Sequence, residues 1–253
     1  MAPREPRDHR GGLEHLPHVP VLSREELGES PLWPALAVLS AASLYATLPT
    51  KFIAGSGSGI YGIVRWLVPA LTILLLGPLV LNVPQQRLLR SAEARASALR
   101  LSRRLASIAV IAVISAANAA SVILLVHFLV AGAQTNARLL LRAGVHMWCM
   151  NVLVFGLWFW QLDGGGPVDR RVEPNPASER DFLFPQQSEP ELASSWQPVF
   201  IDYLYVSYTN ATAFSPTDAM PLSKWAKLLM LTQSAASLLL AIMVVARAVN
   251  ILK

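Results

Sequence analysis

A run of polar side chains lies between residues 198 and 218, immediately before the last apolar stretch of the chain. Its hydroxyl, amide and carboxylate groups could line a path for ions or water; the candidate pore residues are Thr209, Asn210, Thr212, Ala213, Phe214, Ser215 and Asp218. The run is too short to cross a bilayer, which takes about 20 residues. Non-helical backbone at membrane depth occurs only where it is buried in protein or lines water. We therefore predict a re-entrant hairpin, in which a short aromatic helix from Phe200 to Tyr208 leads into a non-helical polar tip and Asp218 caps the next helix.

The segment SYTNATAFSPTD resembles the pore helix and filter of the potassium-channel superfamily, whose signature ends in Thr-Val-Gly-Tyr-Gly-Asp. The positions that align with its threonine, valine and aspartate are Ala213, Phe214 and Asp218. Ser215 and Thr217 stand where the family has glycines, whose positive φ turns the filter carbonyls inward. The resemblance therefore implies a pore module, assembled from several copies of the chain, that passes small cations with little selectivity. The same ending is also similar to that of bacterial multi-pass membrane proteins of unknown function, which implies a bacterial inner (plasma) membrane.

The composition indicates the class of protein around this segment. Of the 253 residues, 53% are apolar and 15% are charged, and the mean hydropathy is +0.43. A soluble domain of this length seldom has such values. The runs long enough to be judged against a bilayer are Leu32–Leu48, Ile63–Val83, Leu105–Val130, Leu139–Trp160 and Trp225–Ile251. We predict an all-α, polytopic membrane helical bundle with about five transmembrane helices and a re-entrant hairpin before the last.

The domain organisation follows from these runs. The predicted parts are a polar N-terminal tail (1–30), a four-helix transmembrane region (31–162) with a basic linker (84–104), a polar loop (163–197), and the hairpin with the last helix (198–253). The arginines of the linker face the cytoplasm by the positive-inside rule. Anionic lipid explains them without nucleic acid. Five crossings then place the N-terminus in the cytoplasm and the hairpin on the same side.

Polar groups inside apolar runs are costly in lipid and have either a functional or a packing role. These intramembrane polar residues are Asn118, His127, His146, Asn151 and Gln233. A proton or ion relay through them is one interpretation. Hydrogen bonds between helices are the favoured one for the amides, and both stay open for the histidines.

Signals for chemistry of other kinds are missing. The chain has no nucleophile-elbow, zinc-protease, phosphate-loop or dinucleotide motif, and its single cysteine, Cys149, lies inside an apolar run. We expect no enzymatic activity, cofactor or metal site. Besides the cation channel, the open alternatives are a small transporter or accessory membrane subunit, and a lipid-modifying enzyme for which no residue constellation is found.

Overall fold

The computed structural model describes residues 30, 32–54, 65–74, 93–132, 136–167, 169–172, 180–189, 196–213 and 218–251. The helices in this part of the chain are α1 (Leu32–Thr47), α2 (Lys51–Ala54), a helix without label (Arg65–Leu74), α4 (Glu93–Val130), α5 (Ala137–Leu162), the short 3-10 helix η2 (Asp163–Gly165), α6 (Asp169–Val172), α7 (Pro185–Ser188), α8 (Phe200–Ala213) and α9 (Lys224–Ile251). Two-residue strands, β1 (Phe182–Leu183) and β2 (Met220–Pro221), pair antiparallel. The predicted all-α class is therefore confirmed.

Among the described residues, three helices are long and apolar enough to cross a membrane. They are Arg104–Val130 within α4, Arg138–Gly165 at α5, and Lys224–Ala246 within α9. The first predicted span corresponds to the shorter apolar helix Leu32–Thr47. The second is described only over the helix Arg65–Leu74, because residues 63–64 and 75–83 lie outside the described residues. Of the five predicted crossings, three are thus matched by helices of sufficient length.

Local side-chain caps explain where the long helices begin. The side chain of Asn136 accepts a hydrogen bond from the backbone N–H of Arg138 at the start of α5 (2.9 Å). Ser223 does the same for Ala226 at the start of α9 (3.1 Å), as N-cap residues do. The prediction that Asp218 caps this helix is wrong, because α9 begins six residues after it and the closer Ser223 supplies the cap.

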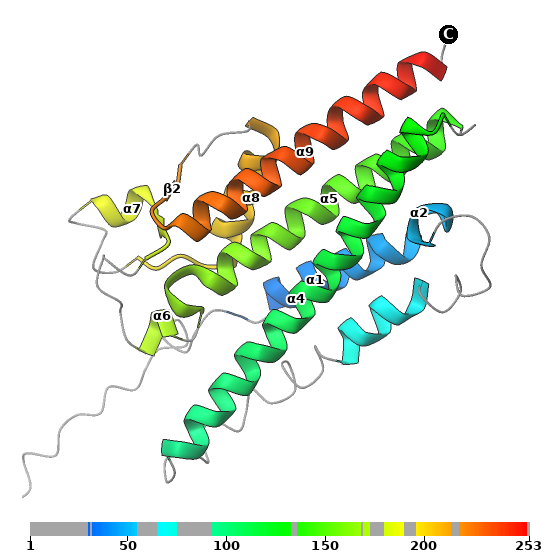
Figure 1. The fold of residues 1–253 in the computed structure, drawn as a ribbon. Helices are drawn as coiled ribbons and strands as arrows, with labels where there is room; N and C mark the ends of the chain where they lie inside the picture. Colours follow the sequence, from blue (N-terminus) through cyan, green and yellow to red (C-terminus); the bar gives the residue numbers. More distant parts are fainter. Residues whose placement is uncertain are drawn as a thin grey trace, which may run out of the picture.

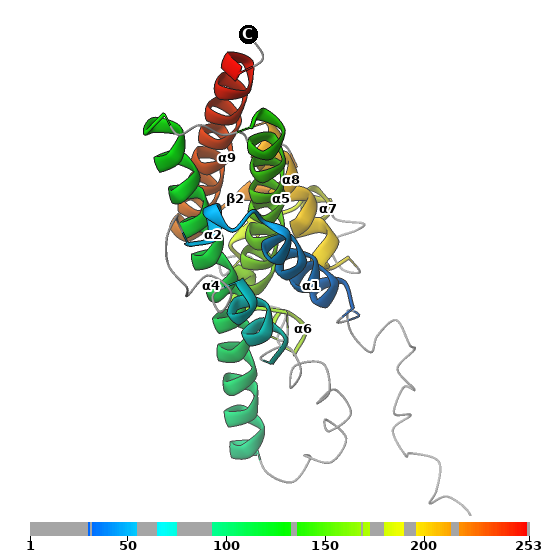
Figure 2. The ribbon, with the colours of Figure 1, turned by 90° about the vertical axis from the view of Figure 1, so that its right-hand side faces the viewer.

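Helix α5 is the centre of the bundle and packs against α1, α4, α8 and α9 (Figure 1). Helices α4 and α5 run antiparallel, since Trp158 Nε1 donates to Ser115 Oγ (2.8 Å) and Arg104 at the start of the first long span lies 3.5 Å from Asp169 just after α5. The view turned by 90° shows α2 against α4, and α1 on the same side of α5 as α8 (Figure 2), where it contacts both helices. A continuous apolar core joins α1, α2, α4, α5 and α9.

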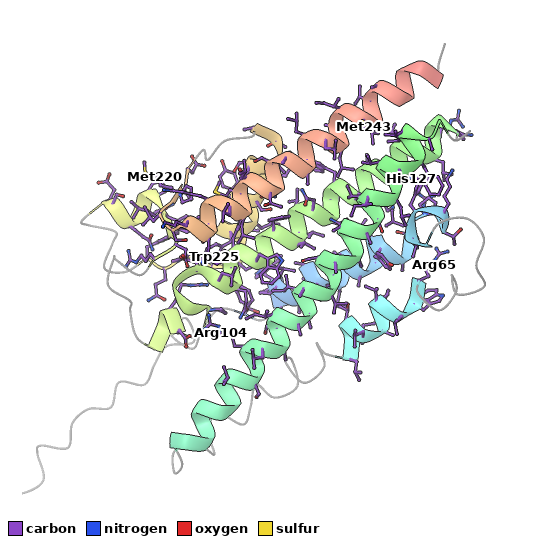
Figure 3. All side chains as sticks on the ribbon, viewed as in Figure 1. Arg65, Arg104, His127, Met220, Trp225 and Met243 are labelled. Carbon is purple, nitrogen blue, oxygen red and sulfur yellow. The ribbon has the colours of Figure 1, made fainter. Side chains whose placement is uncertain are left out.

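Figure 3 gives the two ends of the bundle. Arg104, Met220 and Trp225 lie toward one end, and Arg65, His127 and Met243 lie toward the other. We call these the arginine end and the His127 end. A second, smaller apolar cluster closes the arginine end; its buried members are Phe159, Phe182, Phe184, Tyr203, Val206, Ala219, Ala226 and Met230.

Candidate functional site

Helix α8 starts at the arginine end and runs about half the length of α5. Its 14 residues cover about 21 Å. The ring of Phe200 lies 6.0 Å from that of Trp160, near the end of α5, whereas the ring of Tyr208 lies 5.9 Å from that of Trp148, twelve residues earlier. Helix α8 is therefore antiparallel to α5 and ends beside its middle.

The chain then returns to the end from which α8 started. Leu183 pairs with Met220 in the short ladder, and the backbone N–H of Leu222 donates to the carbonyl of Asp181 (2.8 Å). Helix α9 begins there and also runs antiparallel to α5, because Asn151 contacts it near Gln233. The segment from 200 to 221 thus enters and leaves the bundle at one end, and we call it the hairpin (Figure 1).

Polar side chains from α5, α8 and α9 meet in a buried network inside the bundle. Gln233 Nε2 donates to the carbonyl oxygen (2.9 Å) and to Oγ (2.6 Å) of Ser207, and Gln233 Oε1 accepts from Asn210 Nδ2 (2.9 Å). Ser207 Oγ in turn donates to the carbonyl of Val152 on α5 (2.7 Å). The side chain of Gln233 on α9 is thereby bonded directly to α8, and it is linked to α5 through Ser207.

Two further amides complete this network. Asn210 Nδ2 also donates to the carbonyl of Met230 (3.0 Å), and its Oδ1 accepts from Ser234 Oγ (3.0 Å). Asn151 Nδ2 donates to Ser237 Oγ (2.9 Å). The amides are buried, with 0% of Gln233, 2% of Asn210 and 3% of Asn151 exposed. Because unpaired amides are costly in an apolar interior, these bonds make the three helices one packed unit.

A glycine lets α8 approach α5 closely. A Cβ on Gly156 would lie 3.2 Å from the Cα of Leu204, which is tighter than ordinary van der Waals contact. The backbones of α5 and α8 thus pack against each other with no side chain between them at this point. Small residues at helix crossings have this role in membrane bundles.

A buried carboxylate fixes the entrance of the hairpin. Asp163, 2% exposed, follows directly after α5, and its Oδ1 accepts from the backbone N–H groups of Asp181 (2.8 Å) and Phe182 (3.1 Å). Its Oδ2 accepts from the hydroxyl of Tyr203 on α8. Arg170 Nη1 donates to the carbonyl of Asp163 (2.6 Å), and its guanidinium lies over the Tyr203 ring, 5.0 Å from the centroid. The charge is thus held by several donors, as a buried carboxylate requires.

The glycines after Asp163 make this arrangement possible. Gly164, Gly165 and Gly166 have φ values of 53°, 82° and 110°, which residues other than glycine rarely adopt. The chain leaves α5 in a left-handed turn and brings Arg170 back beneath the helix end. Arg170 Nη1 also donates to the carbonyl of Trp160 (2.8 Å), one of the terminal carbonyls of α5.

The first turn of α8 is stabilised by its own carboxylate. Asp202 Oδ2 accepts from the backbone N–H of Val199, just before the helix (2.7 Å), which is one half of a capping box. Burial raises the pKa of Asp202, and the hydrogen bond from Val199 opposes this shift. At neutral pH, burying the charged form of Asp202 therefore costs free energy.

The candidate pore residues do not form a non-helical tip over the part that is described. Thr209, Asn210, Thr212 and Ala213 belong to α8, which continues past the predicted end at Tyr208. Thr209 Oγ1 donates to the carbonyls of Tyr205 and Val206, and Thr212 Oγ1 to that of Tyr208. The prediction of filter-like backbone at these four positions is wrong, because hydroxyls that bond to the preceding turn are compatible with helix.

The remaining candidate pore residues are spread differently. Phe214 and Ser215 lie outside the described residues. Asp218 is exposed and lies near the Tyr205 hydroxyl of α8. Thr212 and Ala213 are exposed at the end of α8. The structure therefore turns Asn210 into the bundle and leaves Thr212, Ala213 and Asp218 at its surface.

The five intramembrane polar residues are not brought together in one place. Asn151 and Gln233 belong to the buried network, which is the packing role that the sequence favours for amides. His127 is exposed at the His127 end, and His146 Nδ1 donates to the carbonyl of Arg142 within its own helix (2.7 Å). Asn118 is buried on α4, and its Oδ1 has no hydrogen-bond partner among the described residues. A relay running through all five is not formed by these contacts.

The roles of some residues of the site were not predicted from the sequence. Asp163 and Arg170 read as members of a solvated loop, although a carboxylate directly before three glycines at the end of an apolar helix is a signal for a structured helix terminus. Ser207, Ser234 and Ser237 read as pore-lining or small packing residues. Their partners lie on other helices, so the spacing along the chain does not reveal the bonds.

Searches of protein-family models, of curated proteins and of solved structures find no match to the chain.

Proposed function

We propose that the chain is an integral membrane protein that crosses the bilayer five times, with the hairpin re-entering from the arginine end, and that it serves as an accessory membrane subunit. The three long apolar helices support the membrane assignment. Their outward-facing side chains are apolar: on α9, for example, Leu231, Ile242 and Val245 are more than half exposed. Lipid is the environment in which such a surface is stable.

The observation that carries this proposal is the closed hydrogen-bond network at the centre of the hairpin. A conducting filter needs carbonyl or side-chain oxygens that are free to replace the water around an ion. Here the amide oxygen of Asn210 accepts from Ser234 and its nitrogen donates to Gln233, so both ends of this amide are bonded to α9. The hairpin is accordingly a packed joint that makes α5, α8 and α9 rigid, and it offers a subunit surface instead of a pore.

The charges support a cytoplasmic location for the arginine end. Cytoplasmic loops carry an excess of basic residues. Arg104, Lys224 and Lys227 lie where the first and third long spans begin, against Arg138 where the second begins at the other end. The N-terminus and both ends of the hairpin would then be cytoplasmic.

Reconstitution tests the proposal. Purified protein in liposomes is expected to show K⁺ and Na⁺ flux no greater than that of protein-free liposomes, while in native membranes it migrates in a complex of defined stoichiometry with another membrane protein. The complex is expected to be lost on Gln233→Leu, which opens the network, and kept on Thr232→Val, a neighbouring exposed substitution. A cation flux above the protein-free level, or migration of the native protein by itself, would rule out the accessory role.

A weakly selective cation channel is the second candidate function. It is favoured by Thr212 and Ala213, which are exposed at the end of α8, and by Asp218, which is exposed just before the chain enters β2. One chain cannot enclose a path, so this function needs several copies around an axis with the three residues facing it. Single-channel currents that change on Asp218→Asn and not on Asp202→Asn would establish it.

A further inference from the structure

Helix α4 has a polar pair on its buried face that differs from the network of the hairpin. The buried positions on this face recur every three or four residues and are Val110, Ile111, Ile114, Asn118, Ser121 and Leu125. Two of them are polar. Only 5% of Asn118 and 1% of Ser121 is exposed.

One oxygen atom of each side chain lacks a hydrogen-bond partner in the part of the chain that the structure describes. Asn118 Oδ1 and Ser121 Oγ are buried atoms with no partner among the described residues. The neighbouring hydroxyl of Ser115, one turn earlier, accepts from Trp158 Nε1 and donates to the carbonyl of Ile111. Leaving a buried polar group unpaired is costly, so a partner outside the protein is the natural way to satisfy both atoms.

We propose that α4 carries a bound-water site in the interior of the bundle, held by Asn118 Oδ1 and Ser121 Oγ. Residues three apart on a helix lie on the same face, with Cβ atoms about 5–6 Å apart. Their polar atoms can therefore both reach one water molecule, at about 2.8 Å from each. A water molecule can donate to the amide oxygen and exchange a second bond with the hydroxyl, which provides the two polar partners that a buried water needs.

The position of the site gives it a consequence for the bundle. It lies between the Ser115–Trp158 bond on one side and the Phe52–Phe128 ring contact, with centroids 6.1 Å apart, on the other. The site thus lies along α4 between a polar and an aromatic contact. The buried face of α4 carries the water, whereas the amides of Asn151, Asn210 and Gln233 are paired with protein groups.

Water-edited solid-state NMR on the full-length protein in lipid bilayers tests this difference, with the protons of water as the probe. The chain supplies chemically matched controls that are also buried: the amide of Gln233 for Asn118, and the hydroxyl of Ser237 for Ser121. Transfer from water to Asn118 Cγ and Ser121 Cβ is expected to build up several-fold faster than transfer to Gln233 Cδ and Ser237 Cβ. Equal build-up at both pairs would overturn the proposal.

Single substitutions then show whether the two groups hold the water. In Ser121→Ala the transfer to Asn118 Cγ is expected to fall to the rate at Gln233, and in Asn118→Leu the transfer to Ser121 Cβ is expected to fall likewise. Each variant keeps the other reporter, so one that folds suffices. Fast transfer that persists in the folded variants would contradict a site built from this pair.

Discussion

Replacing Gln233 with leucine removes the side chain that joins the three helices of the hairpin unit. The native amide makes three interhelical hydrogen bonds through its own side chain, two to Ser207 and one from Asn210. The two side chains are similar in volume, so the cavity contribution is small. The loss should therefore report on the polar contacts themselves.

The magnitude follows from the number of bonds. Hydrogen bonds between membrane helices contribute about 0.6 kcal/mol on average, with a maximum near 1.7. Three such bonds correspond to about 2 kcal/mol. The variant also leaves Asn210 Nδ2 with one acceptor fewer, which destabilises the folded state further. We expect Gln233→Leu to lower the free energy of unfolding by about 2 kcal/mol.

Equilibrium unfolding in mixed micelles, followed by tryptophan fluorescence, measures this quantity. The matched control is Thr232→Val, because Thr232 is exposed on the same helix and its hydroxyl bonds only to the carbonyl of Leu228. Its effect should stay within about 0.5 kcal/mol. Equal stability of the two variants, or a Gln233→Leu protein more stable than the native one, would refute the claim that the hydrogen bonds of Gln233 hold α5, α8 and α9 together.

Three further predictions concern the hairpin entrance and its packing. Tyr203→Phe removes the hydroxyl that donates to the buried carboxylate of Asp163, and should lower the unfolding free energy by about 1.5–3 kcal/mol, whereas Tyr208→Phe, at an exposed ring, should leave it nearly unchanged. Gly156→Ala places a methyl carbon 3.2 Å from an α8 Cα, and should cost about 1–3 kcal/mol in the same assay; an unaltered unfolding curve would mean that α8 does not pack this closely. Since burial raises the pKa of Asp202, its contribution to stability is fully present below the unfolded pKa of about 3.9 and is lost as the pH rises through the higher folded pKa. Asp202→Asn should therefore be more stable relative to the native protein at pH 7 than at pH 3.5, and a difference that grows toward acid would contradict this sign.

The long helices of the bundle could be predicted from hydropathy alone. The run Leu105–Val130 lies within α4, and Leu139–Trp160 lies within α5, because a stretch of about 20 apolar residues has few alternatives to a helix. The boundaries depend on side chains outside the runs. Helix α4 begins earlier, at Glu93, since the arginine-rich sequence continues as helix, and α9 takes its cap from Ser223 instead of Asp218.

The polar interior could be predicted only in part. That Asn151 and Gln233 need partners follows from the cost of amides in an apolar environment. Which partners they find depends on how α5, α8 and α9 are placed, and the pairs are separated by 23 to 86 residues in the chain. Helix α8 was expected to end at Tyr208 because Ser, Thr and Asn favour caps and turns; tertiary bonds to α9 and hydroxyl bonds to the preceding turn allow it to continue to Ala213.

The clustering of Asp163, Arg170 and Tyr203 has a similar cause. Mixed charges, glycines and prolines after α5 are typical of a solvated loop. The left-handed glycine turn folds this segment back on the helix end, and the aromatic side chains of α8 and β1 then bury it. Neither step can be deduced from the loop alone, because each requires α8 to be already in place beside α5.

Labelling of single cysteines from the two faces of the membrane tests the central claim, the re-entrant hairpin, most directly. In a Cys149→Ser background, Val199→Cys and Met220→Cys place thiols at exposed positions just before α8 and at its return, and Ala131→Cys marks the His127 end. A membrane-impermeant maleimide is expected to reach positions 199 and 220 from the cytoplasmic face and position 131 from the opposite face. Labelling of positions 199 and 220 from opposite faces would mean that α8 crosses the bilayer, and would contradict the account.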